Sequence, residues 1–154
     1  VRGEDNVFRY LPLSKIALRV SAHDSLFDVV ARIAAAKIAG NVLHVSIDAG
    51  LENSVVSFLF ENKEHLLHVN DTMTRENEEL FAQCFGSVQK ILYAHKEAIS
   101  EYVYAQAARS ATFIERSYPL MEGRVEMLHY FQEQSISHSY HRYGNIGARA
   151  LDKK

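Results

Sequence analysis

The sequence has little cysteine, no excess of charge of one sign and no long apolar run. Cys84 is the single cysteine among 154 residues, so no disulfide can form within the chain, which weakly indicates a reducing compartment. With 17 Lys and Arg against 19 Asp and Glu, the net charge is −2, so no broad basic surface favours nucleic acid. No apolar stretch reaches the roughly 18–20 residues of a membrane-spanning helix, and no signal peptide is visible. We therefore expect a cytoplasmic protein without a transmembrane segment and without nucleic acid as a partner.

The length fits one domain, because a chain of 154 residues can bury roughly 68–70% of its unfolded surface. Such a chain needs neither a disulfide nor a metal to fold. It contains no internal repeats, low-complexity tracts or convincing linkers. The first residue is Val1 rather than methionine, which suggests an excised fragment, although a trimmed chain would begin in the same way.

One stretch, residues 32–47, combines the end of a helix, a stop signal and a strand. Apolar residues at a spacing near 3.6 predict a helix with one buried face; these are Leu26, Val29, Val30, Ile33 and Ile38. Asp24 or Ser25 can cap its start, and Gly40 followed by Asn41 suits the left-handed turn that ends it. Residues 42–47 form a short apolar run typical of a strand buried in a sheet. A helix that leads directly into a buried strand is half of a doubly wound α/β unit.

Helices and strands alternate along the rest of the chain. Further strands are expected at residues 15–20, 66–70, 88–94 and 112–115, and further helices at 52–63, 74–85, 96–110 and from Glu122 onward. This order predicts an α/β fold with a doubly wound, mostly parallel sheet. Residues 1–14 would form an N-terminal edge strand or flap, residues 15–134 a Rossmann-like domain, and residues 135–154 an extended C-terminal tail.

Three segments, in the same order, resemble the cofactor-binding half of the aldehyde dehydrogenase superfamily. Residues 34–46, A-A-A-K-I-A-G-N-V-L-H-V-S, are similar to the family run A-P-A-L-A-A-G-N-T-V-V-x-K-P. Residues 88–95, V-Q-K-I-L-Y-A-H, stand where the family has V-x-x-I-x-F-T-G-S, and residues 114–117, I-E-R-S, stand where it has L-E-L-G-G. The resemblance implies a degenerate Rossmann-like fold of this superfamily.

The residues that would hold a dinucleotide in that family differ in this chain. Ser46 or Ile47 stands where the resemblance places the lysine that holds the adenosine ribose. Ala94 and His95 replace the glycine and serine of a turn that lets a helix N-terminus approach the pyrophosphate. The resemblance therefore implies that these four positions are degenerate and that the chain binds no cofactor of its own.

The catalytic residues of the family are also missing, with one exception. Residues 23–25, H-D-S, occupy the region of the asparagine that stabilises the oxyanion in acyl transfer. The family nucleophile is a cysteine that follows the general base, whereas Cys84 precedes that position and is more simply a small buried helix residue. Glu115 aligns with the general base, so we interpret it as a vestige and expect no catalytic residue.

The two ends of the chain resemble one particular group of enzymes within this superfamily. Residues 3–12 and 122–149 resemble segments of bacterial pyrroline-5-carboxylate (glutamate semialdehyde) dehydrogenases, including bifunctional proline utilisation A proteins. Some of these proteins carry a second, inactive aldehyde-dehydrogenase-like domain near the C-terminus. The resemblance implies a non-catalytic domain that supports assembly or covers the passage between active sites. Its partners would be the catalytic domains of the same parent chain, which would hold NAD and, in a bifunctional parent, FAD; a homo-oligomer is a further option.

The aromatic C-terminal tail allows two interpretations. It contains Tyr140, His141, Arg142, Tyr143, Gly144 and Asn145. Tyr and Arg are enriched in protein interfaces, and Gly144 can provide the turn that directs the tail toward a partner. The same side chains could instead cover the domain's own core, and the sequence favours neither interpretation.

The eight histidines do not form a convincing metal site. The best sets are His138 and His141 with His129, and after them His65 with His68. No cysteine or paired carboxylate joins either set at zinc-like spacing, so no metal is expected.

Two alternatives to a non-catalytic domain stay open. A small ligand- or nucleotide-binding domain would be favoured by an open, polar pocket beside Ser46 and Ala94, at the carboxyl ends of the strands. An independent enzyme would have to use Glu115 together with histidines, and a base of this kind needs a substrate within hydrogen-bond reach.

Overall fold

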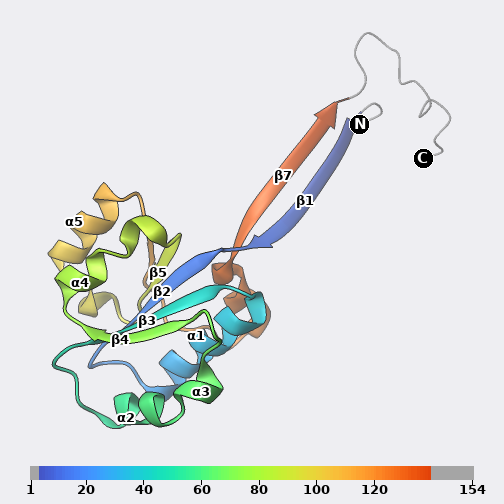
Figure 1. Cartoon of the computed structure of the whole chain (residues 1–154). Coiled ribbons are helices and arrows are strands. Elements are labelled where there is room, and N and C mark those ends of the chain that lie inside the picture. The colour runs from blue at the N-terminus through green and yellow to red at the C-terminus, as the bar shows by residue number, and fades with distance from the viewer. Residues whose placement is uncertain (1–3, 140–154) are drawn as a thin grey trace. The chain divides into compact units, whose positions relative to one another are not determined.

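The computed structural model describes residues 4–139, and the chain divides into two compact units (Figure 1). Residues 12–131 form one unit, and the two end segments, up to Leu11 and from Gln132, form the other. The expected interaction tail, with residues 140–145, lies outside the described residues. Within residues 4–139, no helix is long and apolar enough to cross a membrane.

The unit of residues 12–131 is built on a parallel sheet of five strands. These are β2 (Lys15–Val20), β3 (Val42–Asp48), β4 (Thr72–Glu76), β5 (Lys90–Leu92) and β6 (Phe113–Glu115). They lie in the order β4-β3-β2-β5-β6, and every neighbouring pair is parallel. The chain moves outward from β2 to β4 and then returns to the other side of β2, which places the topological switch point between β2 and β5. The predicted doubly wound, parallel α/β fold is confirmed.

Helices connect the strands of this sheet. They are α1 (Leu26–Ala39), α2 (Ser54–Glu61), α3 (Lys63–Leu66), α4 (Glu78–Ala82), α5 (Glu101–Arg109) and α6 (Gly123–Glu126), with 3-10 turns η1 (Phe85–Ser87), η2 (Lys96–Ala98) and η3 (Met127–Tyr130). Ser25 caps α1 by accepting a hydrogen bond from Asp28 N, and the Asp28 carboxylate accepts from Ser25 N in return. Gly40 ends α1 with a φ of 81°, which is the left-handed turn predicted from the sequence.

Alternating strand residues fill two apolar cores, one on each face of the sheet. On β2, Ile16 and Leu18 point into the core with α1 and α2, whereas Ala17 joins the core with α4 and α5. Figure 1 shows these two pairs of helices on opposite sides of the strands. A central strand that is buried on both faces is typical of a doubly wound sheet.

Two elements beside β4 differ from the prediction. The prediction of a strand at residues 66–70 is wrong. The Asp71 carboxylate accepts a hydrogen bond from His68 N and closes a local turn there before β4 begins. The helix expected at residues 74–85 is too long. Its start is set by Asn77, whose side chain caps α4 only after β4 has ended.

Two helices also differ in detail. Leu26 and Ile38 were expected on the buried face of α1 but are 40% and 77% exposed, because α1 buries only the stripe that contains Val29 and Ile33. The helix expected at residues 96–110 is divided into η2 and α5. Ser100 separates them, since its hydroxyl accepts from Val103 N and caps α5.

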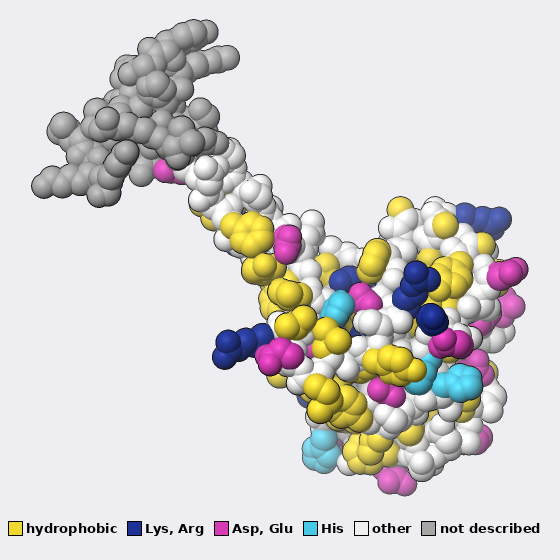
Figure 2. All heavy atoms as spheres, turned by 180° about the vertical axis from the view of Figure 1, so that it is seen from behind, with side chains coloured by type: hydrophobic (Ala, Val, Ile, Leu, Met, Phe, Trp, Pro, Cys, Tyr) yellow, Lys and Arg dark blue, Asp and Glu magenta, His cyan; other side chains and the backbone are white. Residues whose placement is uncertain are grey.

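The second unit contains a two-stranded ribbon of β1 (Glu4–Pro12) and β7 (Phe131–Ser139), whose arrows point in opposite directions in Figure 1. Arg9 Nε donates a hydrogen bond of 2.6 Å to Gln134 Oε1 across the two strands. The exposed apolar side chains of the ribbon are Val7, Phe8, Tyr10, Leu11 and Ile136, and Figure 2 shows apolar side chains along it. Extended structure was expected at residues 1–14 and 135–154; β1 forms in the first segment, whereas β7 begins earlier than expected, at Phe131.

Candidate functional site

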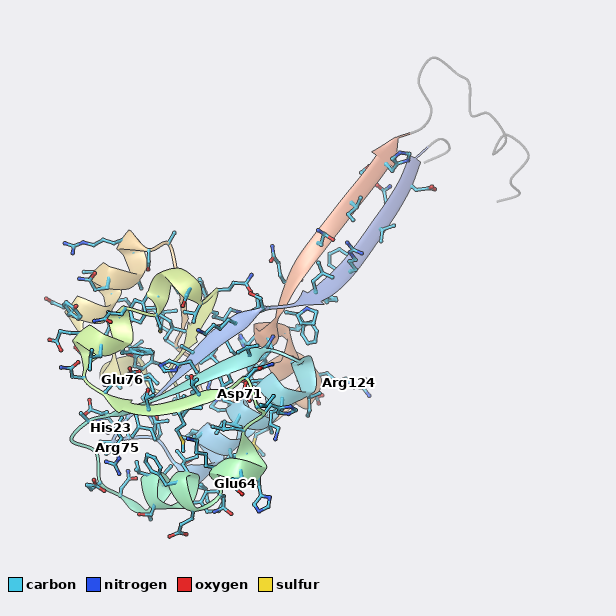
Figure 3. The ribbon with its side chains drawn as sticks, viewed as in Figure 1. His23, Glu64, Asp71, Arg75, Glu76 and Arg124 are labelled. Atoms are coloured by element: carbon cyan, nitrogen blue, oxygen red, sulfur yellow. The ribbon has the colours of Figure 1, made fainter. Side chains whose placement is uncertain are left out.

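A crevice of about 370 Å³ opens at the carboxyl ends of β2 and β3. Its lining includes Arg19, Ser21, His23, Asp48, Glu78 and Ala98. Figure 3 shows His23, in the turn after β2, at the same edge of the sheet as Glu76, the last residue of β4. The carboxyl ends of the strands beside a topological switch point are where open α/β sheets usually bind ligands. This crevice is therefore the candidate functional site.

Ser46 and Ile47 are enclosed by the protein rather than directed into the crevice. Ser46 is fully buried, and its hydroxyl accepts a hydrogen bond of 2.7 Å from Nη1 of Arg19. Ile47 points into the opposite core, with α1 and α2. The position where the resemblance places a ribose-binding lysine is thus filled by the side chains of Arg19 and Ser46.

Arg19 is the centre of a buried polar cluster on the α4 side of the sheet. Its Nη1 also donates to the carbonyl of Glu76 at 3.0 Å, and its Nη2 donates to Asp48 Oδ2 at 2.9 Å. The guanidinium carbon lies 5.1 Å from the centre of the Phe81 ring. His44 extends the cluster, with Nε2 lying 2.8 Å from Glu76 Oε1. The cluster was not expected from the sequence, although an arginine inside the apolar strand K-I-A-L-R-V was a signal for it.

Ala94 and His95 follow β5, where the resemblance places a glycine-serine turn. Ala94 is buried, and His95 Nε2 lies 3.7 Å from Asp24 Oδ1 and 3.8 Å from Asp28 Oδ2. The His95 ring also packs edge-on against Tyr118, with ring centres 4.8 Å apart. Burial raises the pKa of Asp24. An imidazole and two carboxyl groups therefore occupy this end of the switch point.

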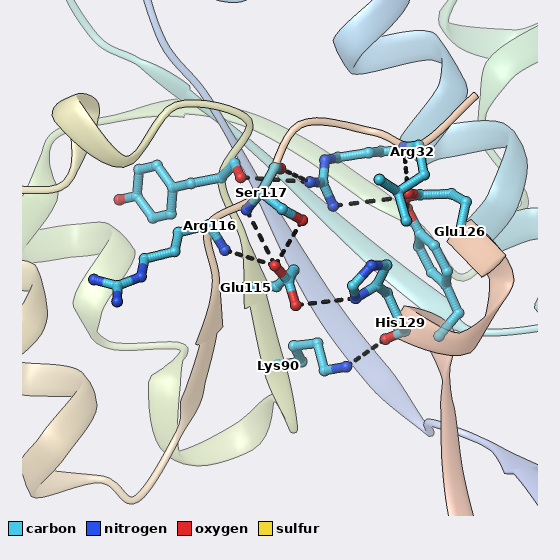
Figure 4. Close-up of polar contacts among 10 residues, drawn as sticks. Arg32, Lys90, Glu115, Arg116, Ser117, Glu126 and His129 are labelled. Carbon is cyan, nitrogen blue, oxygen red and sulfur yellow. Dashed lines mark hydrogen bonds and ion pairs between the residues drawn. The ribbon is translucent and has the colours of Figure 1, made fainter. Parts of the chain in front are cut away.

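Glu115, the vestigial general-base position, has both carboxylate oxygens engaged (Figure 4). Oε2 lies 2.9 Å from His129 Nδ1, while Oε1 accepts from Ser117 Oγ at 2.8 Å and from the backbone N–H groups of Ser117 and Arg116. Burial opposes ionisation, but the Ser117 hydrogen bonds and the His129 charge outweigh it and lower the pKa of Glu115. Glu115 is therefore held ionised by structural donors. The Arg116 guanidinium donates a hydrogen bond to the Tyr104 hydroxyl.

Arg32 joins this region to α1 and was also not expected from the sequence. Its side chain is fully buried, and Nη2 donates to the carbonyls of Ser117 and Tyr93 (Figure 4). Its Nη1 lies 3.9 Å from Glu126 Oε1. A buried guanidinium between three segments fixes the loop after β6 and, with it, the donors to the Glu115 carboxylate.

Cys84 lies between α4 and η1 and is half-buried. Burial, together with the charge of Glu76, raises the pKa of its thiol to about 11. The nucleophilic thiolate is therefore scarce at neutral pH.

Four of the five histidines singled out in the sequence lie in the described residues. His129 pairs with Glu115, while His141 lies outside the described residues. In the described part of the chain, residues 4–139, no group of three or more His, Cys, Asp or Glu side chains could hold a metal ion.

No protein-family model matches the sequence, and no curated protein matches it either. Solved structures do match. Betaine aldehyde dehydrogenase from Staphylococcus aureus, solved with NAD+, is 13% identical with a TM-score of 0.61, and the match covers 74% of this chain and 24% of that one. Lactaldehyde dehydrogenase is 17% identical, with a TM-score of 0.61 and coverages of 74% and 25%. PutA from Anabaena variabilis, assigned as an aldehyde dehydrogenase, is 14% identical, with a TM-score of 0.53 and the same coverages.

The chain therefore shares the fold of one part of these aldehyde dehydrogenases. At these identities the likeness establishes the fold alone. The chain spans about a quarter of the length of the dehydrogenases it matches.

Proposed function

We propose that the chain is a non-catalytic structural domain of an aldehyde-dehydrogenase-type protein. The single observation that carries this proposal is a buried arginine: Arg19 bonds to Ser46 and Asp48 at the position where the sequence resemblance places the ribose-binding lysine. A side chain that is 3% exposed and bonded to three partners cannot move aside without leaving buried polar groups unpaired.

The charges around the crevice support the same conclusion. Asp48 and Glu78 line it, and Asp24 and Asp28 lie beside His95. A dinucleotide carries a negatively charged pyrophosphate, which such a crevice repels. The chain therefore holds no NAD of its own in this proposal, and NAD, with FAD in a bifunctional parent, binds the catalytic domains of the parent.

Catalytic chemistry is disfavoured for separate reasons. Glu115 accepts hydrogen bonds on Oε1, pairs with His129 through Oε2, and is a poor proton acceptor because its pKa is lowered. The Cys84 thiol is protonated at neutral pH because its pKa is raised.

The parent is proposed to be a cytoplasmic glutamate semialdehyde (pyrroline-5-carboxylate) dehydrogenase of proline catabolism. The sequence resemblance of residues 3–12 and 122–149 supports this assignment, and PutA from Anabaena variabilis is among the structural matches. In such a parent the domain would support assembly or cover the passage of the substrate between active sites.

The ribbon of β1 and β7 is the proposed assembly element. Two-stranded ribbons are marginally stable alone in water, and this one exposes Phe8 and Tyr10. Burial of these side chains by the catalytic domains of the parent chain, or by a second copy, would stabilise the ribbon. Residues 140–145 are proposed to contribute to the same contact through their tyrosines and arginine.

Calorimetric titration of the chain with NAD+ tests the proposal. We expect no saturable heat at micromolar concentrations, whereas betaine aldehyde dehydrogenase from Staphylococcus aureus serves as a binding control because it is solved with NAD+. Micromolar binding of NAD+ by the chain would contradict the proposal and favour a nucleotide-binding domain.

A further inference from the structure

Another hollow, of about 440 Å³, lies between α5 and β6, the strand at one edge of the sheet. We call it the α5–β6 hollow. Ala107 and Ala108 of α5 are part of its lining, and their small side chains leave space that longer ones would fill. The residues that line it differ from those that line the crevice beside β2 and β3. It is therefore a separate candidate site.

Apolar side chains of the α5–β6 hollow are open to water. Phe113, in β6, is 60% exposed, and Tyr104, in α5, is 37% exposed. Ala107 and Ile114 belong to the lining as well, and both pack against the core on this side of the sheet. Covering such surface is favourable in proportion to the apolar area that is removed from water. The hollow therefore favours a ligand with an apolar body.

Two polar groups meet in the same lining. Nη1 of Arg116 donates a hydrogen bond of 3.2 Å to the Tyr104 hydroxyl, and both residues line the hollow. This bond uses one of the five N–H donors of the guanidinium, and it leaves the hydroxyl proton of Tyr104 as a further donor. Two donors side by side match the two oxygens of one carboxylate.

The charge of the α5–β6 hollow is positive. Among the described residues that line it, Arg116 alone is charged. Its side chain extends away from the carboxylate of Glu115, whose oxygens are held by His129 and Ser117 (Figure 4). Within residues 4–139, the side-chain bond of Arg116 goes to Tyr104 rather than to a carboxylate. The hollow therefore attracts an anion.

We propose that the α5–β6 hollow binds a small apolar molecule that carries one carboxylate group. The carboxylate accepts hydrogen bonds from the Arg116 guanidinium and the Tyr104 hydroxyl, and the apolar body covers Ala108 and Phe113. The volume of about 440 Å³ lies within the range of small-molecule pockets, roughly 300–1,000 Å³. The inference does not rest on the non-catalytic role proposed above, because it concerns other residues and a ligand other than NAD+.

Titration of the isotope-labelled full chain with hydrocinnamate near neutral pH, followed by the amide chemical shifts in NMR spectra, tests this site. We expect saturable shifts in α5 and β6. Binding should become about tenfold weaker in Arg116→Gln, because a charge-assisted hydrogen bond is lost. Arg109→Gln is the matched control and should bind like the unchanged chain, since Arg109 is exposed in the last turn of α5 but does not line the hollow.

Hydrocinnamyl alcohol, which has the same apolar body without charge, should bind at least tenfold more weakly than hydrocinnamate. Ala108→Leu should weaken binding by a similar factor because the larger side chain fills the hollow. Ala108 is exposed, so this variant decides the outcome if circular dichroism shows that Arg116→Gln is unfolded.

Four results would overturn the inference. They are the absence of saturable shifts in α5 and β6, equal binding of the alcohol, unchanged binding by Arg116→Gln or Ala108→Leu, and a loss in Arg109→Gln as large as that in Arg116→Gln.

Discussion

Side chains are treated in opposite ways in two regions of the molecule. One region is the crevice at the carboxyl ends of β2 and β3, and the other is the ribbon of β1 and β7. Around the crevice, Arg19 is bonded to the chain's own serine, carboxylate and carbonyl groups. On the ribbon, Phe8 and Tyr10 contact each other and are otherwise largely exposed. The difference teaches that the polar groups of the sheet unit are satisfied within the chain, whereas the ribbon leaves apolar side chains exposed.

The largest expected effect is loss of a core aromatic in the sheet unit. Phe81 is fully buried against Phe85, with ring centres 5.0 Å apart, and beneath Arg19. Phe81→Ala should lower the free energy of unfolding by about 3–5 kcal/mol, measured by urea denaturation. Phe113→Ala is the matched control, because Phe113 is 60% exposed and its loss should cost less than about 1 kcal/mol. Equal losses would contradict the described core.

A smaller effect is expected at the buried guanidinium. Arg19→Lys cannot reproduce the bonds to Ser46, Asp48 and a carbonyl at once, so it should lower the free energy of unfolding by about 1–3 kcal/mol. Arg75→Lys is the control, since Arg75 pairs with the exposed Glu52 and should lose less than about 1 kcal/mol. If both substitutions cost the same, Arg19 does not organise the crevice.

The pH dependence of stability should change when Glu115 is neutralised. Its pKa is held below the usual 4.5 in the folded chain. Its ionised form therefore contributes stability above about pH 4.5, and this is lost as the pH falls through the folded value. In Glu115→Gln, the difference in unfolding free energy between about pH 7 and pH 3 should shrink by less than about 1 kcal/mol, because the carboxylate is only partly buried.

Asp24→Asn provides the contrast to Glu115→Gln. Burial raises the pKa of Asp24 above its usual 3.8, so its contribution to stability is present at low pH and lost as the pH rises through the folded value. The substitution should therefore favour folding more near neutral pH than in acid, opposite to Glu115→Gln. The same slope for both variants would show that one of the two environments is wrongly described.

The smallest effect on stability is expected on the ribbon. Phe8→Ser should change the free energy of unfolding by less than about 0.5 kcal/mol, because Phe8 is 60% exposed. It should instead weaken association with a partner domain or a second copy, measured by sedimentation at increasing concentration. A large loss of stability without a change in association would contradict the proposed role of the ribbon.

Local sequence patterns predicted much of the fold, because their causes are local. The cap at Ser25, the stop at Gly40 and the apolar run of β3 each depend on a few neighbouring residues. The strand expected at residues 66–70 failed for a reason of the same kind, since the side chain of Asp71 closes a turn there. Here a polar side chain competed successfully with an apolar run.

From the sequence, the site could be predicted only as the absence of residues that the family pattern contains. Comparison with the aldehyde dehydrogenase pattern marked Ser46 and His95 as positions that differ from it, but not which groups of the chain these residues contact. Those groups come from distant segments: Arg19 reaches Ser46 from the neighbouring strand, and Asp24 approaches His95 from the turn before α1. Pairings of this kind depend on the parallel register of the sheet, which periodicity alone does not specify.

Hydrogen exchange of the full chain, measured by mass spectrometry with and without NAD+, tests the account most directly. We expect slow exchange in β2 and β3, faster exchange in β1 and β7, and no change in either region when NAD+ is added. NAD+-dependent protection of the segments that carry Arg19, Ser46 and His95 would contradict the account, because it would show that the crevice still accepts the dinucleotide.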